Sequence, residues 1–138
     1  MSMFKIFDTA ATGMSAQSLR LNLVASNMAN ADSVSSSIEQ TYRSRQPVFR
    51  AMLDQTRGDG APSVGVKMVG VVESQAPLIK EYSPDHPLAD EEGNIFRPNV
   101  NMVEEMANMI SAARSYQSNV EVVNTAKQLM SATLRLGE

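Results

Sequence analysis

The chain has 138 residues, which is enough for one compact domain or for one small domain with extended arms and argues against a multi-domain enzyme. Its 12 basic and 15 acidic residues give a formal net charge of -3, so the composition favours neither nucleic acid nor an anionic membrane as a partner. The absence of Cys excludes disulfides, thiolate metal sites and thiol catalysis. Its 10 Met stand beside 4 Phe, 3 Tyr and no Trp, a composition that suits contacts between helices.

Residues 4–30 predict a first long helix, because they contain no Pro, one Gly and three charged side chains. The segment does not resemble a cleaved secretory signal, since Asp8 interrupts its apolar start. Apolar residues recur at the spacing of a coiled coil, in a seam of Phe7, Ala10, Met14, Gln17, Leu21, Val24, Met28 and Ala31. Leu19 and Leu23 lie off this seam, so we expect the helix to contact a second neighbour.

Residues 101–136 predict a second helix with a stricter pattern. Asn101 and Glu104 are spaced like a capping box just after Pro98, which predicts the helix start, and Gly137 can end the helix. Steps of four and three alternate along its seam, which consists of Met102, Met106, Met109, Ala113, Tyr116, Val120, Val123, Lys127, Met130 and Leu134. At 1.5 Å per residue the two helices would be about 40 and 50 Å long, too long to wrap into a compact sphere.

The middle of the chain changes to a strand pattern. Residues 46–52 and 64–73 predict two strands joined by a turn at 57–60. Val64, Val66 and Met68 would share one side of the second strand, because side chains alternate along a strand. Weaker strand candidates are residues 78–82 and 95–96, and the Ser-rich stretch 33–37 predicts a polar hinge.

These elements predict an α+β fold, with long N- and C-terminal helices paired as an antiparallel coiled coil and a small β-rich insert between them. The expected divisions are an N-terminal axial helix at 1–32, the hinge and insert at 33–98, and a C-terminal axial helix at 99–138. A lone helix pair would bury only part of its apolar surface. The free energy gained by this burial would therefore be smaller than the conformational entropy cost of ordering the two helices. The ends should therefore be loosely structured in the isolated chain and become continuous helices when other subunits cover them.

The run Ser-Asn-Met-Ala-Asn at 26–30 admits two interpretations. In the first, Asn30 caps the helix C-terminus and Asn27 is solvated. In the second, amide side chains held between packed helices fix their register, because each must find hydrogen-bond partners, and residues of the second helix act alike. The predicted assembly surface comprises Phe7, Met14, Leu21, Val24, Asn27, Met28 and Asn30, together with Met102, Met106, Met109, Tyr116, Asn119, Val120, Val123, Asn124, Lys127, Met130 and Leu134.

The sequence predicts no catalytic, cofactor-binding or metal site. The single His, His86, lies among acidic residues, but Pro87 and the lack of a second His favour a rigid, solvated turn over a metal ligand. Glu104 and Glu105 are better explained as charges at a helix start than as an acid–base pair. An enzyme would need a site that we do not find, and loss of an activity on changing His86 would be the simplest evidence for one.

Several segments together resemble a known family. A hydrophobic N-terminal helix ending in Ser-Asn-Met-Ala-Asn, with a heptad helix at the C-terminus, is similar to the bacterial flagellar axial proteins of rod and hook. The sequences Tyr-Ser-Pro-Asp-His-Pro-Leu-Ala-Asp at 82–90, Arg-Pro-Asn-Val-Asn-Met-Val-Glu-Glu-Met at 97–106 and Ala-Arg-Ser-Tyr-Gln-Ser-Asn at 113–119 resemble the basal-body rod proteins within that family. The resemblance spans nearly the whole chain.

The resemblance implies a non-enzymatic building block of the proximal rod, which crosses the periplasm, with no cofactor. It implies export from the cytoplasm through the flagellar type III apparatus and polymerisation through the terminal helices into a hollow, torque-transmitting shaft. The implied partners are further copies of the chain, the rod proteins FlgB, FlgF and FlgG, and the adaptor FliE, with no nucleic acid and no direct membrane span. Two alternatives stay open: a distal rod subunit, although those usually carry larger inserts, or a soluble helical adaptor or binding module that is highly helical alone.

Overall fold

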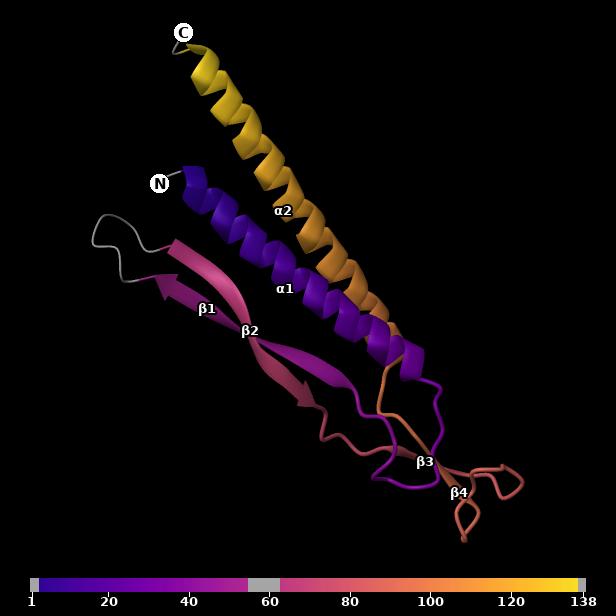
Figure 1. The fold of residues 1–138 in the computed structure, drawn as a ribbon. Helices are drawn as coiled ribbons and strands as arrows, with labels where there is room; N and C mark the ends of the chain where they lie inside the picture. Colours follow the sequence, from indigo (N-terminus) through magenta and orange to yellow (C-terminus); the bar gives the residue numbers. More distant parts are fainter. Residues whose placement is uncertain (1–2, 55–62, 137–138) are drawn as a thin grey trace.

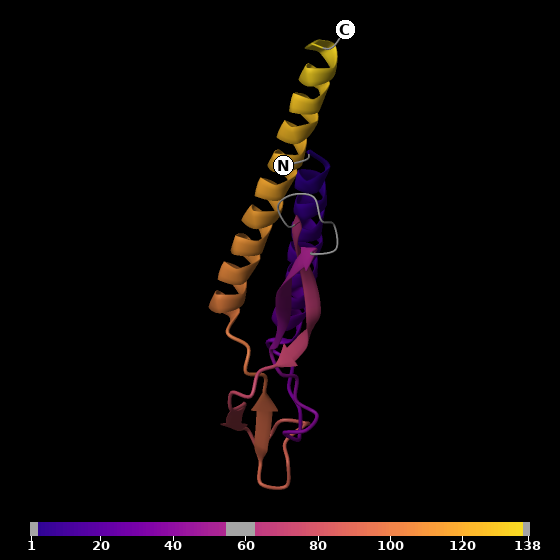
Figure 2. The same ribbon diagram turned by 90° about the vertical axis from the view of Figure 1, so that its left-hand side faces the viewer.

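The computed structural model describes residues 3–54 and 63–136 of the chain. Two long helices run antiparallel and side by side, with both termini at one end of an elongated molecule (Figures 1 and 2). The elements in chain order are α1 Met3–Asn30, β1 Arg45–Asp54, β2 Ser63–Glu73, β3 Ile79–Tyr82, β4 Asn94–Arg97 and α2 Met102–Leu136. The predicted α+β class is confirmed, and so are both predicted helices and all four strands.

The ends of the helices are set by short-range side-chain contacts. Asn101 Oδ1 accepts the backbone N–H groups of Val103 at 3.1 Å and Glu104 at 3.4 Å, which confirms Asn101 as the N-cap of α2. Asn30 Nδ2 donates to the Ser26 carbonyl at 2.8 Å, one turn back along the last turn of α1. The end predicted at Gly137 lies outside the described residues.

β1 and β2 form an antiparallel hairpin that lies along α1, on the side away from α2 (Figure 1). The register runs from Arg45 opposite Glu73 to Asp54 opposite Ser63, with an irregularity that leaves Val69 without a partner. The backbone N–H of Val66 donates to Thr12 Oγ1 of α1 at 3.2 Å. The hairpin is therefore a second neighbour of α1 besides α2, as predicted, although Leu19 stays 37% exposed. The turn expected at 57–60 lies outside the described residues.

β3 and β4 form a smaller sheet at the opposite end from the termini. Gly93 precedes β4 with a φ of 80°, and a Cβ atom there would lie 3.0 Å from the Tyr82 ring, so the position suits only Gly. Ser35 exchanges backbone hydrogen bonds with Phe96 of β4, at 3.0 and 2.9 Å. The segment predicted as a free polar hinge is thus tied to β4, because it completes the hydrogen bonding of that strand.

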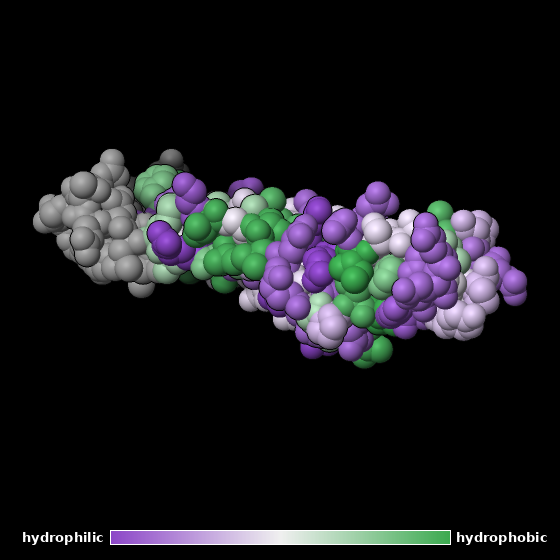
Figure 3. Space-filling view, turned by 90° about the horizontal axis from the view of Figure 1, so that it is seen from below, coloured by the Kyte–Doolittle hydropathy of each residue, from purple (hydrophilic) through white to green (hydrophobic). Residues whose placement is uncertain are grey.

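Much apolar surface stays exposed on this elongated shape. Seen from below, apolar side chains interrupt the polar surface of the hairpin and of the lower end (Figure 3). The exposed apolar residues of the strands include Val69 at 53%, Val72 at 55% and Ile79 at 54% exposure. Of the predicted group on β2, Val66 is 37% exposed and Met68 half-buried, and the side chain of Val64 lies outside the described residues. Neither helix, within the described residues, is long and apolar enough to cross a membrane.

Candidate assembly site

The two helices approach each other closely where small and polar residues meet. Gly13 of α1 faces Asn119 of α2, and a Cβ atom at position 13 would lie 2.9 Å from Asn119 Nδ2. Arg20 of α1 donates a hydrogen bond to Asn108 Oδ1 of α2 at 3.0 Å. The buried apolar residues of the two helices are also small, apart from one Val: Ala10, Ala16, Val24, Ala112 and Ala126. Close approach of the backbones therefore matters more here than interdigitation of long side chains.

Asn27, near the end of α1, is fully buried, and the chain itself satisfies its amide. Its Nδ2 group donates to the Arg45 carbonyl at 2.9 Å and to Ser44 Oγ at 3.4 Å. Its Oδ1 atom accepts the Arg45 backbone N–H at 2.9 Å and the Tyr42 hydroxyl at 2.8 Å. The interpretation of Asn27 as solvated is wrong. Its partners lie in the segment that enters β1, so Asn27 fixes where β1 begins relative to α1.

Further polar contacts connect this junction to the first turn of α2. Gln46 Nε2 donates to Glu105 Oε1 at 3.3 Å, and Glu105 is only 2% exposed. The positive end of the helix dipole stabilises a carboxylate at this position. Burial raises the pKa of Tyr42 above its usual value; the charge of Arg45 opposes this shift, and those of Glu105 and Glu73 add to it. The Tyr42 phenol therefore keeps the proton that it donates to Asn27.

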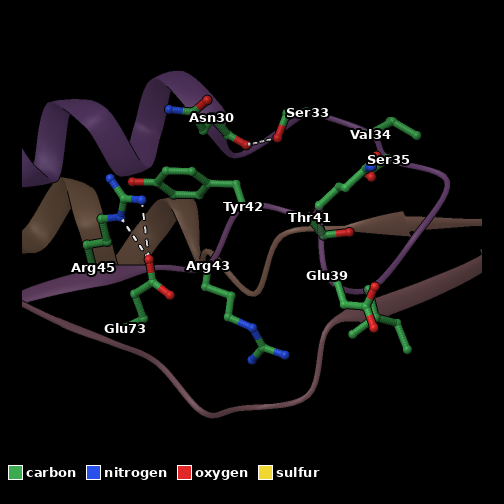
Figure 4. Close-up of a pocket in the computed structure, with 12 residues that line it drawn as sticks. Asn30, Ser33, Val34, Ser35, Glu39, Thr41, Tyr42, Arg43, Arg45 and Glu73 are labelled. Atoms are coloured by element: carbon green, nitrogen blue, oxygen red, sulfur yellow. Dashed lines mark hydrogen bonds and ion pairs between the residues drawn. The ribbon is translucent and has the colours of Figure 1, made fainter.

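A hollow of about 700 Å³ lies beside the junction, between the end of α1, the segment that follows it and β2 (Figure 4). Arg43 donates to the carbonyls of Ser74 at 3.2 Å and Ala76 at 3.4 Å. Arg45 pairs with Glu73 at 3.2 Å. The two guanidinium groups thus connect the segment that enters β1 to β2 and to the residues that follow β2, so the hollow is part of a structural junction.

The loop around His86 is organised by its own side chains. His86 Nδ1 accepts the Leu88 backbone N–H at 3.1 Å, as expected of a residue in a tight turn. Asp90 Oδ1 accepts the backbone N–H groups of Asn94 at 2.7 Å and Glu92 at 2.9 Å, and these bonds, chiefly that from Asn94, lower the pKa of Asp90. Within the part of the chain that the structure describes, no three His, Cys, Asp or Glu side chains are grouped to hold a metal ion.

Comparison with known proteins identifies the family. Residues 7–35 match the family described as "Flagella basal body rod protein", and residues 91–136 match "Flagellar basal body rod FlgEFG protein C-terminal". The chain is 50% identical over 138 residues to the flagellar basal-body rod protein FlgC of Escherichia coli O6:H1, and 49% identical to that of Salmonella typhimurium, with both chains fully covered. FlgC of Borreliella burgdorferi is 31% identical over 149 residues, covering 99% of this chain and 98% of the relative.

The chain belongs to the FlgC family of flagellar basal-body rod proteins. The two segments that match rod families contain most of α1 and all of α2. The hairpin and β3 lie between them, and the FlgC relatives extend the similarity through this region. The parts of this FlgC-family chain with the widest likeness to rod proteins are thus the two helices that carry the predicted assembly residues.

The structure places the predicted assembly residues of the two helices differently. On α1, Val24 and Asn27 are buried, and the half-buried residues are Phe7, Met14, Leu21, Met28 and Asn30. On α2, Met109, Asn119, Val120, Val123 and Met130 are half-buried, whereas Met102, Met106, Tyr116, Asn124, Lys127 and Leu134 are exposed. All seven predicted residues of α1 are thus wholly or partly covered by the chain itself, whereas six of the eleven on α2 are exposed.

Sequence reasoning missed the residues of α2 that are most deeply buried. These are Glu105, Ala112 and Ala126, and with Asn119 they form a series with a seven-residue spacing. The predicted seam lies to one side of this series because large apolar residues were given more weight than small ones. The spacing of the small residues, together with the only Gly of α1, was the signal that could have located this contact.

Proposed function

We propose that this FlgC-family chain is a non-enzymatic structural subunit of the proximal rod, which polymerises through its terminal helices into a hollow shaft that transmits torque. The observation that carries this proposal is the apolar surface that α2 leaves uncovered. Val103 is 75% exposed, Met106 50%, Ile110 53%, Leu129 55% and Leu134 70%. Surface of this extent on a single helix is typical of an interaction site.

The proposed mechanism is capture of helices by the growing end of the rod. Each arriving subunit adds its α1–α2 pair to those already assembled, and the pair becomes an antiparallel coiled coil whose outer faces are covered by neighbours. The axial helices are residues 1–32 and 99–138, and the insert at 33–98 lies outside the tube. The antiparallel contact between α1 and α2 and the exposed Met102, Met106 and Leu134 support this division of labour.

The proposed location is the rod where it crosses the periplasm, after unfolded export through the flagellar type III apparatus. Proposed partners are other copies of the chain, FlgB, FlgF, FlgG and FliE. The resemblance to rod proteins and the family match to the FlgEFG C-terminal segment support them. Torque would pass between subunits through the many apolar contacts of the exposed α2 face. Burial of apolar surface in these contacts would stabilise the rod by roughly 25 cal/mol per Å².

The test is to place a charge on the exposed face of α2. In Met106→Asp the new carboxylate meets water in the single chain, since Met106 is 50% exposed, but would be buried without a partner in the rod. We expect loss of rods and of swimming, with the purified chain as soluble as the parent. Rods are scored by electron microscopy of basal bodies, and soluble chain by gel filtration and circular dichroism.

The matched control is Ser111→Asp, an exposed polar position five residues from Met106, so that the two side chains point about 140° apart around the helix. This variant should assemble and swim normally. Normal swimming of Met106→Asp would contradict the assembly role of this face. Circular dichroism of the parent chain separates the alternatives: helix content that rises on polymerisation fits a rod subunit, whereas full helicity in a small stable oligomer fits an adaptor.

A further inference from the structure

Two apolar patches lie on opposite sides of α1. The first, the α2 patch, consists of Val103, Met106 and Ile110, which share one helix face because they are three and four residues apart. Their exposures are 75%, 50% and 53%. The second belongs to the hairpin, which covers α1 on the side away from α2 (Figure 1).

The hairpin patch is on the outer face of the two strands. Gln46 of β1 points toward the helices, because its side chain bonds to Glu105 of α2. Side chains alternate along a strand, so Pro47 and its partner Val71 point away from the helices. Beyond the irregularity at Val69, Val66 is the partner of Ala51, which lies on the same face of β1 as Pro47. The outer patch therefore comprises Val66, Val69 and Val71, which are 37%, 53% and 43% exposed. Figure 3 shows apolar side chains on this part of the hairpin.

The lower part of the hairpin patch, Val69 and Val71, lies at the height of the α2 patch, and Val66 lies higher along the hairpin. Glu105 lies between Val103 and Met106 in the sequence, although it faces the other side of α2. Its hydrogen bond to Gln46 places the lower end of the hairpin at the level of these residues. Gln46 pairs with Val72. Val71 is one residue and Val69 three residues further up the hairpin, so they lie roughly 3 and 10 Å above this pair. Ile110 lies five residues beyond Glu105 on α2, a rise of about 8 Å. Copies set side by side would therefore bring unlike patches together without a large axial shift.

We propose that the hairpin patch of one copy packs on the α2 patch of a second copy, with the two copies side by side. This inference rests on the proposed rod function and names the partner of the exposed α2 face. The arrangement continues a pattern already present in the chain, in which the hairpin covers the free side of a helix: its own α1, and then the α2 of the neighbour. Because the two patches differ, the contact is heterologous, and repetition of it builds a ring or an open helix.

The absence of Cys allows a direct test by cross-linking. Ile110→Cys and Val69→Cys, both at positions that are 53% exposed, are produced as separate full-length chains in the same cells and treated with a short bismaleimide. We expect a cross-linked dimer that contains one chain of each kind. The matched control replaces Val69→Cys by Ile79→Cys, at a position 54% exposed on β3, and should lose the dimer.

Two results would overturn the contact. Dimers formed by Ile110→Cys alone would show that like patches meet, and cells that swim with both variants but yield no mixed dimer would show that another rod protein covers α2. In either case the rod function itself would stand. If instead cells without this chain still build rods and swim, the proposed function fails independently of any cross-link.

Discussion

The junction below α1 and the outer face of α2 differ in how far the chain satisfies its own groups. At the junction, the buried amide of Asn27 makes four hydrogen bonds to Tyr42, Ser44 and Arg45. On the outer face of α2, apolar residues such as Val103 are left 75% exposed. The amide of Asn27 is thus satisfied within one chain, whereas the outer face of α2 would be covered by other molecules in the proposed rod.

Under the proposed function, this difference would let a subunit hold a defined junction before it meets its neighbours. Polar groups give directional contacts, so they suit a junction whose geometry must be fixed before assembly. Apolar contacts have no fixed direction and grow with the area buried, so they suit surfaces that meet several neighbours. Variants of each region should therefore affect different measurements: stability at the junction, and assembly on α2.

The largest effect on stability is expected from removing the Asn27 side chain. Asn27→Ala removes the partner of the Tyr42 hydroxyl and of the backbone N–H and C=O groups of Arg45, which are part-buried in the folded chain. A buried group left without a partner costs about 1–3 kcal/mol. We expect the free energy of unfolding to fall by about 2–5 kcal/mol, measured by urea denaturation of the full chain. Asn124→Ala, at an exposed amide of α2, should change it by less than about 0.5 kcal/mol. Equal effects of the two variants would remove the contrast between the regions.

A smaller effect sharpens the account of the helix contact. Replacing a Gly inside a helix by Ala normally stabilises it by about 1 kcal/mol. At Gly13 the new Cβ would meet Asn119 Nδ2 at 2.9 Å, so this gain should largely vanish in Gly13→Ala. In the Asn119→Ala background the same change should recover about 1 kcal/mol, which a double-mutant cycle measures. Identical gains in both backgrounds would mean that the helices are not in close contact here.

The smallest effect is a dependence on alkaline pH. Because burial raises the pKa of Tyr42, the folded chain keeps a proton that the unfolded chain, with a pKa of about 10, has lost. The free energy of unfolding should therefore fall as the pH rises from about 10 through the folded pKa. Tyr42→Phe should flatten this slope, measured as the urea midpoint between pH 8 and 11. Tyr82→Phe, at a ring 72% exposed, is the matched control, and an equally flattened slope there would contradict the role of Tyr42.

Local signals in the sequence predicted most of the fold. Asn101 with Glu104 located the start of α2, since a cap depends on a few neighbouring residues. Alternating Val residues located β2 in the same way. Asn30 ends α1 as its position in the sequence suggested, and its side chain bonds to Ser26 one turn earlier. These features are settled within one or two turns of the chain, so periodicity and residue type are enough to predict them.

The candidate site was predicted less completely. The heptad pattern of α2 fits two overlapping series that share Met109, Tyr116, Val123 and Met130, and sequence alone could not say which of them faces α1. The larger apolar residues favoured the series that contains Met102 and Met106. The buried Ala112 and Ala126 belong to the other series. The hydrogen bonds from Asn27 to Arg45 cross 18 residues of chain and left no local signal.

The sequence by itself determined the helices, the strands, their order and the membership of a rod-protein family, because each depends on local residue patterns or on similarity along the whole chain. Only the tertiary structure decided which face of α2 is covered, what Asn27 binds and that the supposed hinge at Ser35 pairs with Phe96. The physical reason is that these features depend on how residues far apart in the chain approach one another. A periodic pattern states that a face is apolar, but not which neighbour covers it.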